Sequence, residues 1–468
     1  MTEVQGMSAA GAGPHVAVVG GGLAGLAAAA ALTDAGCRVT LLEARRRCGG
    51  RAASFEDPVA GGLVDACQHV AMGCCTNFLD LCRWGGIDAA LRRDRTLWFI
   101  GPEGDRSSCT PSRRLPAPLH LAPLLVSMRH FSLVEKLALA IGMARLARHR
   151  PTATVDAATA LEWLRSIGQP ERVIRLFWQP VLESALGESI DLVSVAASRK
   201  VIVDGFLAHR DAADLMVPTQ PLGVLFGERL AARLAARGCE VRTAAAVASI
   251  ERDRGRAVAV VTGDERLPCD GVVVAVPWKA AARLLPDMVA VGDERLAGSP
   301  ITAVHLWFDR DVLDVPHAVL VGRVSQWVFR GAPGDGHCQV VISASRGLLQ
   351  GDRRAIVETV VAELREIFPA ARAAELRDAR VVTDPTAVLS VRPGVESLRP
   401  PAVTGVPNLV LAGDWTATGW PSTMEGAVRS GRLAAAAVGR SLGVAVRGPA
   451  PDLPTSPLTR LLAGGRDA

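Results

Sequence analysis

Three glycines and one glutamate are the residues whose spacing first indicates chemistry. Gly20, Gly22 and Gly25 form the pattern Gly-x-Gly-x-x-Gly, and Glu43 follows eighteen residues after the last of them. In such a pattern the first glycine permits a tight turn, the second lets a pyrophosphate approach the backbone, and the third lets a helix pack closely on a strand. The helix N-terminus adds partial positive charge, and the carboxylate can bind both ribose hydroxyls. The pattern therefore predicts a dinucleotide-binding site.

A second glycine-rich segment follows directly, because residues 48–51 read Cys-Gly-Gly-Arg. This segment resembles the GG-R signature of the flavin amine oxidase and phytoene desaturase superfamily. Two further motifs of that superfamily follow in the same order, at residues 411–415 and 425–427. The second motif begins a helix, and the resemblance implies that the N-terminus of this helix faces the reduced flavin. The resemblance implies FAD as the cofactor. The contacts implied in this way are Gly49, Gly50, Arg51, Gly413, Asp414, Glu425, Gly426 and Ala427, and Val247 is a further candidate.

A narrower resemblance bears on the substrate. Residues 64–73 resemble the D-x-G-Q-H stretch of the bacterial squalene-associated FAD-dependent desaturases, which are read as hydroxysqualene dehydroxylases. Residues 177–181, 304–309 and 326–329 match other blocks of that family, and residues 411–431 match its most specific one. The likeness runs from residue 15 to residue 442. Cys67 departs from the pattern, since a glycine or another small residue is expected there.

The resemblance implies a reductive dehydroxylation of an apolar C30 isoprenoid, hydroxysqualene. Such chemistry needs an acid for a poor leaving group, a pocket that excludes water, and a long apolar tunnel. His69 is the first candidate for the acid or for orienting it, with Gln68 and Asp65 beside it, although a purely structural role for His69 has about equal weight. The candidates for the substrate pocket are Trp178, Trp307, Trp327 and Trp420, for each of which core packing is an alternative.

Other functions remain open. A carotenoid-type desaturase or isomerase would keep the same fold. A flavin amine oxidase usually needs a lysine near the flavin and an aromatic cage, but lysines occur only at positions 136, 200 and 279 and the chain has no tyrosine. A flavoprotein scaffold without activity is a fourth interpretation. The sequence identifies no electron donor for the flavin.

The elements that position these residues begin with an apolar run over residues 15–19, a helix to residue 35 and a strand over residues 38–42. The predicted fold class is α/β: a Rossmann-like FAD-binding domain of the two-dinucleotide-binding type, with an inserted α+β substrate domain and a helical cap. The predicted domain ranges are 14–80, 205–285 and 395–445 for FAD, and 81–204 and 286–394 for the substrate. A flexible leader (1–13) and a poorly ordered, proline-rich tail (446–468) complete the chain.

The middle of the chain is expected to be mostly helical over residues 80–205. Later strands are expected at 240–242, 246–252, 257–261, 271–276, 302–308, 317–329, 338–344 and 409–412, and helices at 218–237, 355–367 and 425–442.

Composition excludes several classes of protein. With 49% hydrophobic and 21% charged residues, the chain is too apolar for disorder. Its longest uncharged apolar window, residues 16–33, contains four glycines and is typical of a strand, a turn and a helix rather than of a membrane span. Ten cysteines and no secretory signal indicate a reducing cytoplasm, and the absence of a Cys-x-x-Cys pair argues against a metal site. A net charge of +5 without a basic motif argues against nucleic acid.

One segment suggests contact with a lipid surface. Residues 111–150 contain seven Lys or Arg and one Glu, with apolar stretches between them. Two interpretations are about equally supported: a basic surface that faces anionic lipid at the inner face of the membrane, or a helical cap whose apolar side is core.

Overall fold

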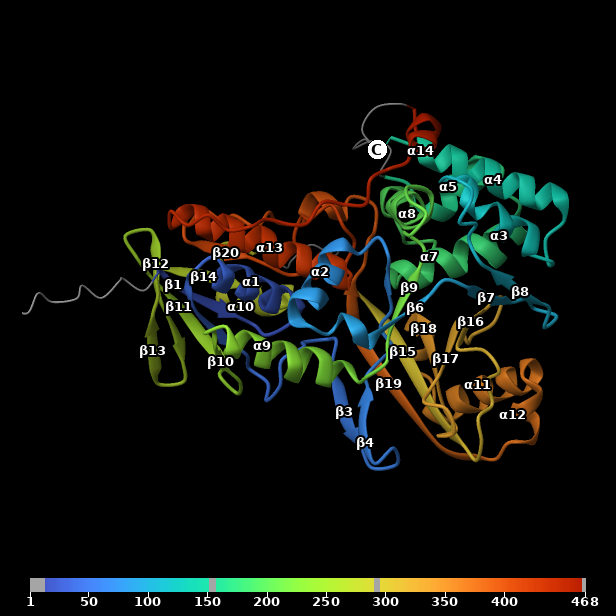
Figure 1. Cartoon of the computed structure of the whole chain (residues 1–468), viewed down its shortest axis with the longest axis horizontal. Helices are drawn as coiled ribbons and strands as arrows, with labels where there is room; N and C mark the ends of the chain where they lie inside the picture. Colours follow the sequence, from blue (N-terminus) through green and yellow to red (C-terminus); the bar gives the residue numbers. More distant parts are fainter. Residues whose placement is uncertain (1–12, 151–156, 290–294, 465–468) are drawn as a thin grey trace, which may run out of the picture.

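The first of two large sheets carries the glycine turn. The computed structural model describes residues 13–150, 157–289 and 295–464. Five parallel strands lie in the order β10-β2-β1-β14-β20 (Figure 1). They are Glu240–Arg242 (β10), Arg38–Leu42 (β2), His15–Val19 (β1), Gly271–Val274 (β14) and Leu409–Leu411 (β20). Both ends of the matched sequence therefore meet in one sheet.

Both faces of this parallel sheet are covered, as its apolar strands require. Helix α1 (Leu23–Asp34), rich in alanine, packs beside α13 (Met424–Ser441) on one face. The other face packs against an antiparallel sheet and a short helix, and Val260, Val272 and Trp278 share one core there. These elements are Val247–Asp253 (β11), Arg256–Thr262 (β12), Glu265–Pro268 (β13) and Trp278–Leu284 (α10).

The second large sheet has seven strands in the order β19-β15-β18-β17-β16-β7-β8. They are Leu376–Leu389 (β19), Gly298–Phe308 (β15), His337–Ser343 (β18), Trp327–Arg330 (β17), His317–Leu320 (β16), Leu97–Ile100 (β7) and Arg106–Cys109 (β8). Helices α11 (Arg353–Ile367) and α12 (Pro369–Ala373) cover one face, where Val304 and Val360 share a core.

A layer of helices lies on the opposite side of this sheet and forms what we call the helical cap (Figure 1). Its members are Leu119–Leu121 (η2), Ala122–Ser127 (α3), Leu133–Arg148 (α4), Ala160–Ser166 (α5), Glu171–Val173 (α6), Ile174–Trp178 (η3), Gln179–Leu186 (α7), Val195–Ile202 (α8), Val203–Leu207 (η4) and Pro457–Leu462 (α14). The core of the cap is built from leucine, isoleucine and valine around the fully buried Trp178.

Short elements join the two halves. A hairpin of β3 (Ser54–Asp57) and β4 (Gly62–Asp65) follows the first strands, and α2 (Thr76–Gly85) packs against α13. A small sheet pairs β5, β9 and β6, and a helical run follows it. The remaining bounds are Ala71–Met72 (β5), Leu215–Pro218 (β9), Leu91–Asp94 (β6), Gly223–Leu230 (η5), Ala231–Ala236 (α9), Asp88–Ala90 (η1), Ser345–Leu348 (η6) and Val395–Leu398 (η7).

Two expectations need correction. Residues 80–205 are largely helical, as expected, but β6, β7 and β8 occupy parts of 91–109, and β7 pairs with the distant β16. The proline-rich tail, expected to be poorly ordered, forms α14 in its described part, where Ser456 caps the helix and its hydroxyl donates to the Ala117 carbonyl at 2.5 Å. Residues 1–12 of the expected leader lie outside the described residues. None of the described helices is both long and apolar enough to cross a membrane.

Candidate functional site

The glycine turn has the geometry that the spacing predicts. Gly20 has φ +106°, in the region that favours glycine, and its N–H donates to the Leu42 carbonyl at 2.7 Å. A Cβ on Gly25 would lie 1.8 Å from the Gly20 carbonyl oxygen, so a side chain there would displace the turn. Gly22 differs, because its Cβ would meet only the Gly50 Cα, at 3.8 Å. Gly25 thus serves the packing of α1, whereas Gly22 leaves open backbone at the helix N-terminus.

Glu43 lies at the end of β2, directly under this turn. One carboxylate oxygen accepts from the Gly21 N–H and the other from the Arg45 N–H, each at 2.7 Å. The carboxylate is buried and held in one orientation. Each oxygen has a second lone pair, which leaves it able to accept from a ribose hydroxyl.

The second glycine segment packs on the first. The Gly49 N–H donates to the Gly21 carbonyl at 2.8 Å, and Gly22 and Gly49 form a parallel bridge. Beside them is a cavity of about 310 Å³ whose lining includes Arg45, Arg46 and Arg47. The lining also contains Gly50 and Glu56, and Glu56 pairs with Arg47. The open backbone at the N-terminus of α1 therefore has a basic segment next to it, which suits a pyrophosphate.

Arg51 joins this segment to the C-terminal part of the chain. Its guanidinium forms a short ion pair with Asp414 and donates to the Ala387 carbonyl at 2.8 Å. Asp414 is buried and also accepts from the Ser422 hydroxyl. Two residues predicted separately to contact the cofactor thus touch each other, although 363 positions separate them.

Helix α13 begins where the sequence predicts, with Thr423 as its cap accepting from the Gly426 N–H at 3.1 Å. The Glu425 side chain, however, is turned toward α2. Its fully buried carboxylate accepts from the Phe78 N–H at 2.8 Å and from the Asn77 side-chain amide at 2.9 Å. Any cofactor contact of Glu425 is left to its backbone. The roles of Gly413, Gly426, Ala427 and of Val247, which begins β11, stay predictions.

His69 follows β4 and the turn after it. Its Nδ1 lies 2.8 Å from the Cys67 carbonyl, which only accepts, so Nδ1 carries a proton and Nε2 is the nitrogen that titrates. Burial lowers the pKa of His69, and the nearby Arg51 cation lowers it further against the effect of the Cys67 carbonyl. The Arg51 cation, which pairs with Asp414, thus also acts electrostatically on the candidate acid.

Asp65 and Gln68 hold this segment in place. One Asp65 oxygen accepts from the Ser54 hydroxyl at 2.6 Å and from the Leu222 N–H at 2.8 Å, which ties the hairpin to η5. The Gln68 N–H donates to the Gln339 side chain at 2.5 Å. Burial raises the pKa of the Cys67 thiol to about 12, so this departure from the family pattern is a neutral group.

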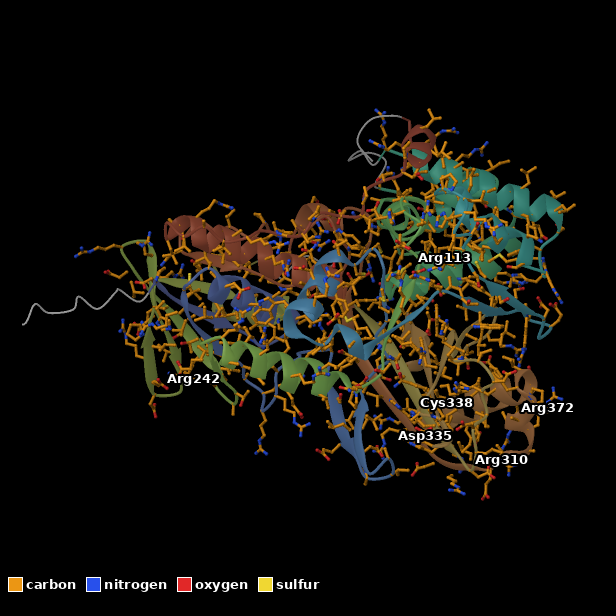
Figure 2. The ribbon with its side chains drawn as sticks, in the orientation of Figure 1. Arg113, Arg242, Arg310, Asp335, Cys338 and Arg372 are labelled. Atoms are coloured by element: carbon orange, nitrogen blue, oxygen red, sulfur yellow. The ribbon has the colours of Figure 1, made fainter. Side chains whose placement is uncertain are left out.

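Gln339 is one end of a buried network that the sequence did not reveal. Its amide nitrogen lies 2.7 Å from the His305 Nε2, and the His305 Nδ1 lies 3.2 Å from the His337 Nε2. Burial lowers the pKa of His305 to about 4, and His337 adds to the effect. Figure 2 labels Cys338, next to His337 on β18, and Asp335 in the turn before this strand, both far from Arg242 on β10.

The four tryptophans differ in their surroundings. Trp178 is fully buried in the helical cap, where its Nε1 donates to Gln169 at 2.9 Å. Trp307 stacks on His305 and His337. Trp327 donates to the Ser184 hydroxyl at 2.8 Å, and Trp420 lies near Lys200 and Arg429, whose cations are 4.6 and 5.2 Å from its ring centre. Trp178 packs in the cap core, and a pocket role stays a prediction for all four tryptophans.

Sequence reasoning missed several supporting residues. Ser422 lies within the matched block after Asp414, so its position was a usable signal. Asn77 and Gln339 had no such signal, because each contact depends on a partner more than 250 positions away.

Fold and site together define a protein built on a dinucleotide-binding domain. The chain belongs to the flavin-containing amine oxidoreductase family, whose model matches residues 23–439. Since this family carries a flavin and the glycine turn suits a dinucleotide, the cofactor is FAD and the protein is an FAD-dependent oxidoreductase. The predicted α/β fold, cofactor and enzyme class are thereby confirmed.

Known proteins similar to this chain cover all three enzymatic interpretations. Hydroxysqualene dehydroxylase of Sinorhizobium fredii is 27% identical over 441 residues, which cover 90% of this chain and 97% of that protein. The chloroplastic/chromoplastic 15-cis-phytoene desaturase of Solanum lycopersicum is 26% identical over 456 residues, with 91% and 77% covered. Cyclohexylamine oxidase from Brevibacterium oxydans has a similar structure, with a TM-score of 0.66, 21% identity, and 92% of this chain and 100% of that chain covered. The structural likeness shows the fold alone.

Proposed function

We propose that this enzyme catalyses the reductive dehydroxylation of hydroxysqualene to squalene. The observation that carries the proposal is the way His69 is held: the Cys67 carbonyl lies 2.8 Å from its Nδ1, so its Nε2 is the titrating nitrogen. The Arg51 cation that pairs with Asp414 lowers the pKa of this ring. The similarity to a hydroxysqualene dehydroxylase over nearly the whole of both chains supports the substrate.

The reaction needs one proton and one hydride. The C–O bond breaks, the oxygen leaves as water with the added proton, and the allylic carbon receives the hydride. Bound FAD in its reduced form supplies that hydride and its electron pair. A low pKa makes the protonated form of His69 a strong acid, which suits a poor leaving group such as a hydroxyl.

The chain's own residues have separate tasks in this scheme. Arg51 and Asp414 hold the cofactor side of the site, and the Cys67 carbonyl keeps the Nδ1 of His69 protonated in both states of the ring. Gln68 and Asp65 fix the segment that carries His69 through bonds to Gln339, Ser54 and Leu222. Gln68 and Asp65 are therefore positioning residues, and His69 is the proton donor.

We also place the enzyme in the cytoplasm. All ten cysteines are free thiols, as a reducing compartment favours.

A phytoene-type desaturase is the second candidate, favoured by the similarity to the tomato enzyme. It would run in the opposite redox direction, since it removes hydride from its substrate. An amine oxidase is a weaker third candidate, because the chain has no tyrosine for an aromatic cage.

A product assay separates the candidates. The purified holoenzyme, reduced with dithionite without oxygen, is given hydroxysqualene. The oxidised enzyme is given phytoene or an amine in parallel. The proposal predicts squalene only from the reduced enzyme. A desaturated product, or peroxide from an amine, would instead assign the enzyme to one of the other two classes.

A further inference from the structure

Residues 111–150 were expected either to face lipid or to form a cap whose apolar side is core. Helix α4 has one face of each kind. One side of the helix packs Leu139, Leu146 and their neighbours into the cap core. The other side exposes an apolar stripe that includes Leu133 and Leu137, and Leu133 is 84% exposed. Residues 133, 137 and 141 are four positions apart, so they lie along one face. Part of this segment is core, and part of it is an uncovered apolar surface.

Neighbouring segments extend the stripe. Val126, near the end of α3, is 77% exposed, and its carbonyl accepts from the Lys136 ammonium at 3.1 Å, which ties α3 to the start of α4. Leu115 and Leu119 are also exposed.

Helix α14 adds a contribution from the far end of the chain. Its Leu461 is 73% exposed, and Leu458 is exposed beside it. The helix is anchored by Ser456 to the Ala117 carbonyl and by the Thr459 hydroxyl to the Leu207 carbonyl at 2.6 Å, and it packs against α4. We call the exposed apolar side chains of these segments the cap surface: Leu115, Leu119, Val126, Leu133, Val134, Leu137, Ile141, Leu458 and Leu461.

The charge of the segment that carries most of the cap surface is mainly positive. Residues 111–150 contain seven basic residues and a single acid, Glu135. The Glu135 carboxylate is already bonded by the Ser132 hydroxyl and by Arg172, so it presents little free negative charge. Exposed arginines at 113, 114, 129 and 148 accompany the apolar side chains, and Arg460 adds another on α14. Figure 2 labels Arg113 on the cap side of the molecule.

We propose that the cap surface docks on an anionic lipid bilayer, with its leucines and valines in the acyl boundary and its arginines at the headgroups. Apolar side chains ringed by cations are what an interfacial protein presents to such a membrane. The three helices lie at the end of the molecule away from the dinucleotide sheet, so docking would leave that sheet free (Figure 1). The inference rests on the proposed function in one respect: a C30 substrate would reside in that bilayer.

Flotation with lipid vesicles tests this docking. The full-length holoenzyme is mixed with vesicles of phosphatidylcholine alone or with added phosphatidylglycerol. We expect flotation only with the anionic vesicles, and weaker flotation at high salt. Leu133→Glu/Leu137→Glu and Leu458→Glu/Leu461→Glu should each lower binding by about tenfold or more, because each removes apolar contact and adds negative charge. Leu349→Glu/Val403→Glu, at exposed apolar positions outside the cap surface, is the matched control and should bind normally.

Several results would overturn the proposal. One is a wild-type protein that does not bind anionic vesicles. Another is that the variants of the cap surface float as well as the wild type. A third is a lipid-free dimer that Leu133→Glu/Leu137→Glu dissociates, while the protein binds no vesicles. Bound FAD and turnover of detergent-dispersed hydroxysqualene are measured on the same samples. Normal turnover without flotation would refute only the docking proposal. Flotation without turnover would refute only the proposed reaction.

Discussion

At the scale of residues, the two nitrogens of His69 have different tasks. Nδ1 keeps its proton because the Cys67 carbonyl only accepts, so every change of charge occurs at Nε2. Burial and Arg51 together favour the neutral ring. In the proposed mechanism, the proton donor is therefore mostly neutral at neutral pH, and its lowered pKa makes the protonated ring a stronger acid.

This arrangement predicts the direction of the pH dependence. Turnover should fall as the pH rises above the lowered pKa of His69, by about tenfold per pH unit, because only the protonated ring donates. His69→Gln should lose most turnover and this pH dependence while it keeps FAD. The measurement is a pH–rate profile with bound flavin determined by absorbance. A variant with the wild-type rate or profile would refute the acid role.

A second histidine, His305, is expected to affect the pH dependence of stability rather than of turnover. Its pKa is about 4 in the folded protein and about 6.5 when unfolded, so between these values the unfolded chain binds more protons. Stability should therefore fall as the pH drops through this window, by at most about 3 kcal/mol from this group.

Denaturant unfolding at several pH values measures this loss. His305→Gln should flatten the dependence of the unfolding free energy on pH between about 6.5 and about 4. An unchanged slope in His305→Gln would contradict the account.

At the scale of elements, the strand, turn and helix at the start of the chain were predictable because their signals are local. The valine run, the glycine spacing and the alanine-rich helix lie within 28 residues of each other, over 15–42. Strands β7 and β8 were not predictable in this way, because β7 pairs with β16, more than 200 positions away. Strand β19 mixes arginine, aspartate and threonine with valine, and its pairing with β15 rather than its own pattern makes it a strand.

Gly22 and Gly25, at the start of α1, give a matched pair of substitutions that tests the glycine turn. Gly22→Ala should fold normally, since the new Cβ meets nothing closer than 3.8 Å, but it should bind FAD at least about tenfold more weakly because the methyl group obstructs the pyrophosphate. Gly25→Ala should be destabilised by about 1–3 kcal/mol or more, because its Cβ would lie 1.8 Å from the Gly20 oxygen.

Thermal unfolding of the apoprotein and flavin titration separate these effects. A Gly22→Ala protein that binds FAD like the wild type would remove the cofactor role of that position. A Gly25→Ala protein of normal stability would contradict the packing role.

At the scale of the whole molecule, the candidate site is made from segments that only the fold brings together. Arg51 and Asp414 were each predicted from a motif, and their contact confirms that the two ends of the chain close on one place. The Glu425 side chain shows the limit of motif reasoning, since the contact with Asn77 that turns it to α2 arises only in three dimensions. The apolar composition is divided among two sheet cores, the cap core and the cap surface.

The direction of electron flow tests the central claim most directly. The holoenzyme is reduced without oxygen and mixed rapidly with hydroxysqualene while the visible absorbance of the flavin is followed. The account predicts that the absorbance of the oxidised flavin returns in a single turnover and that one squalene forms per flavin. A flavin that stays reduced with hydroxysqualene, while the oxidised enzyme is bleached by a polyene precursor, would contradict it and would establish a desaturase.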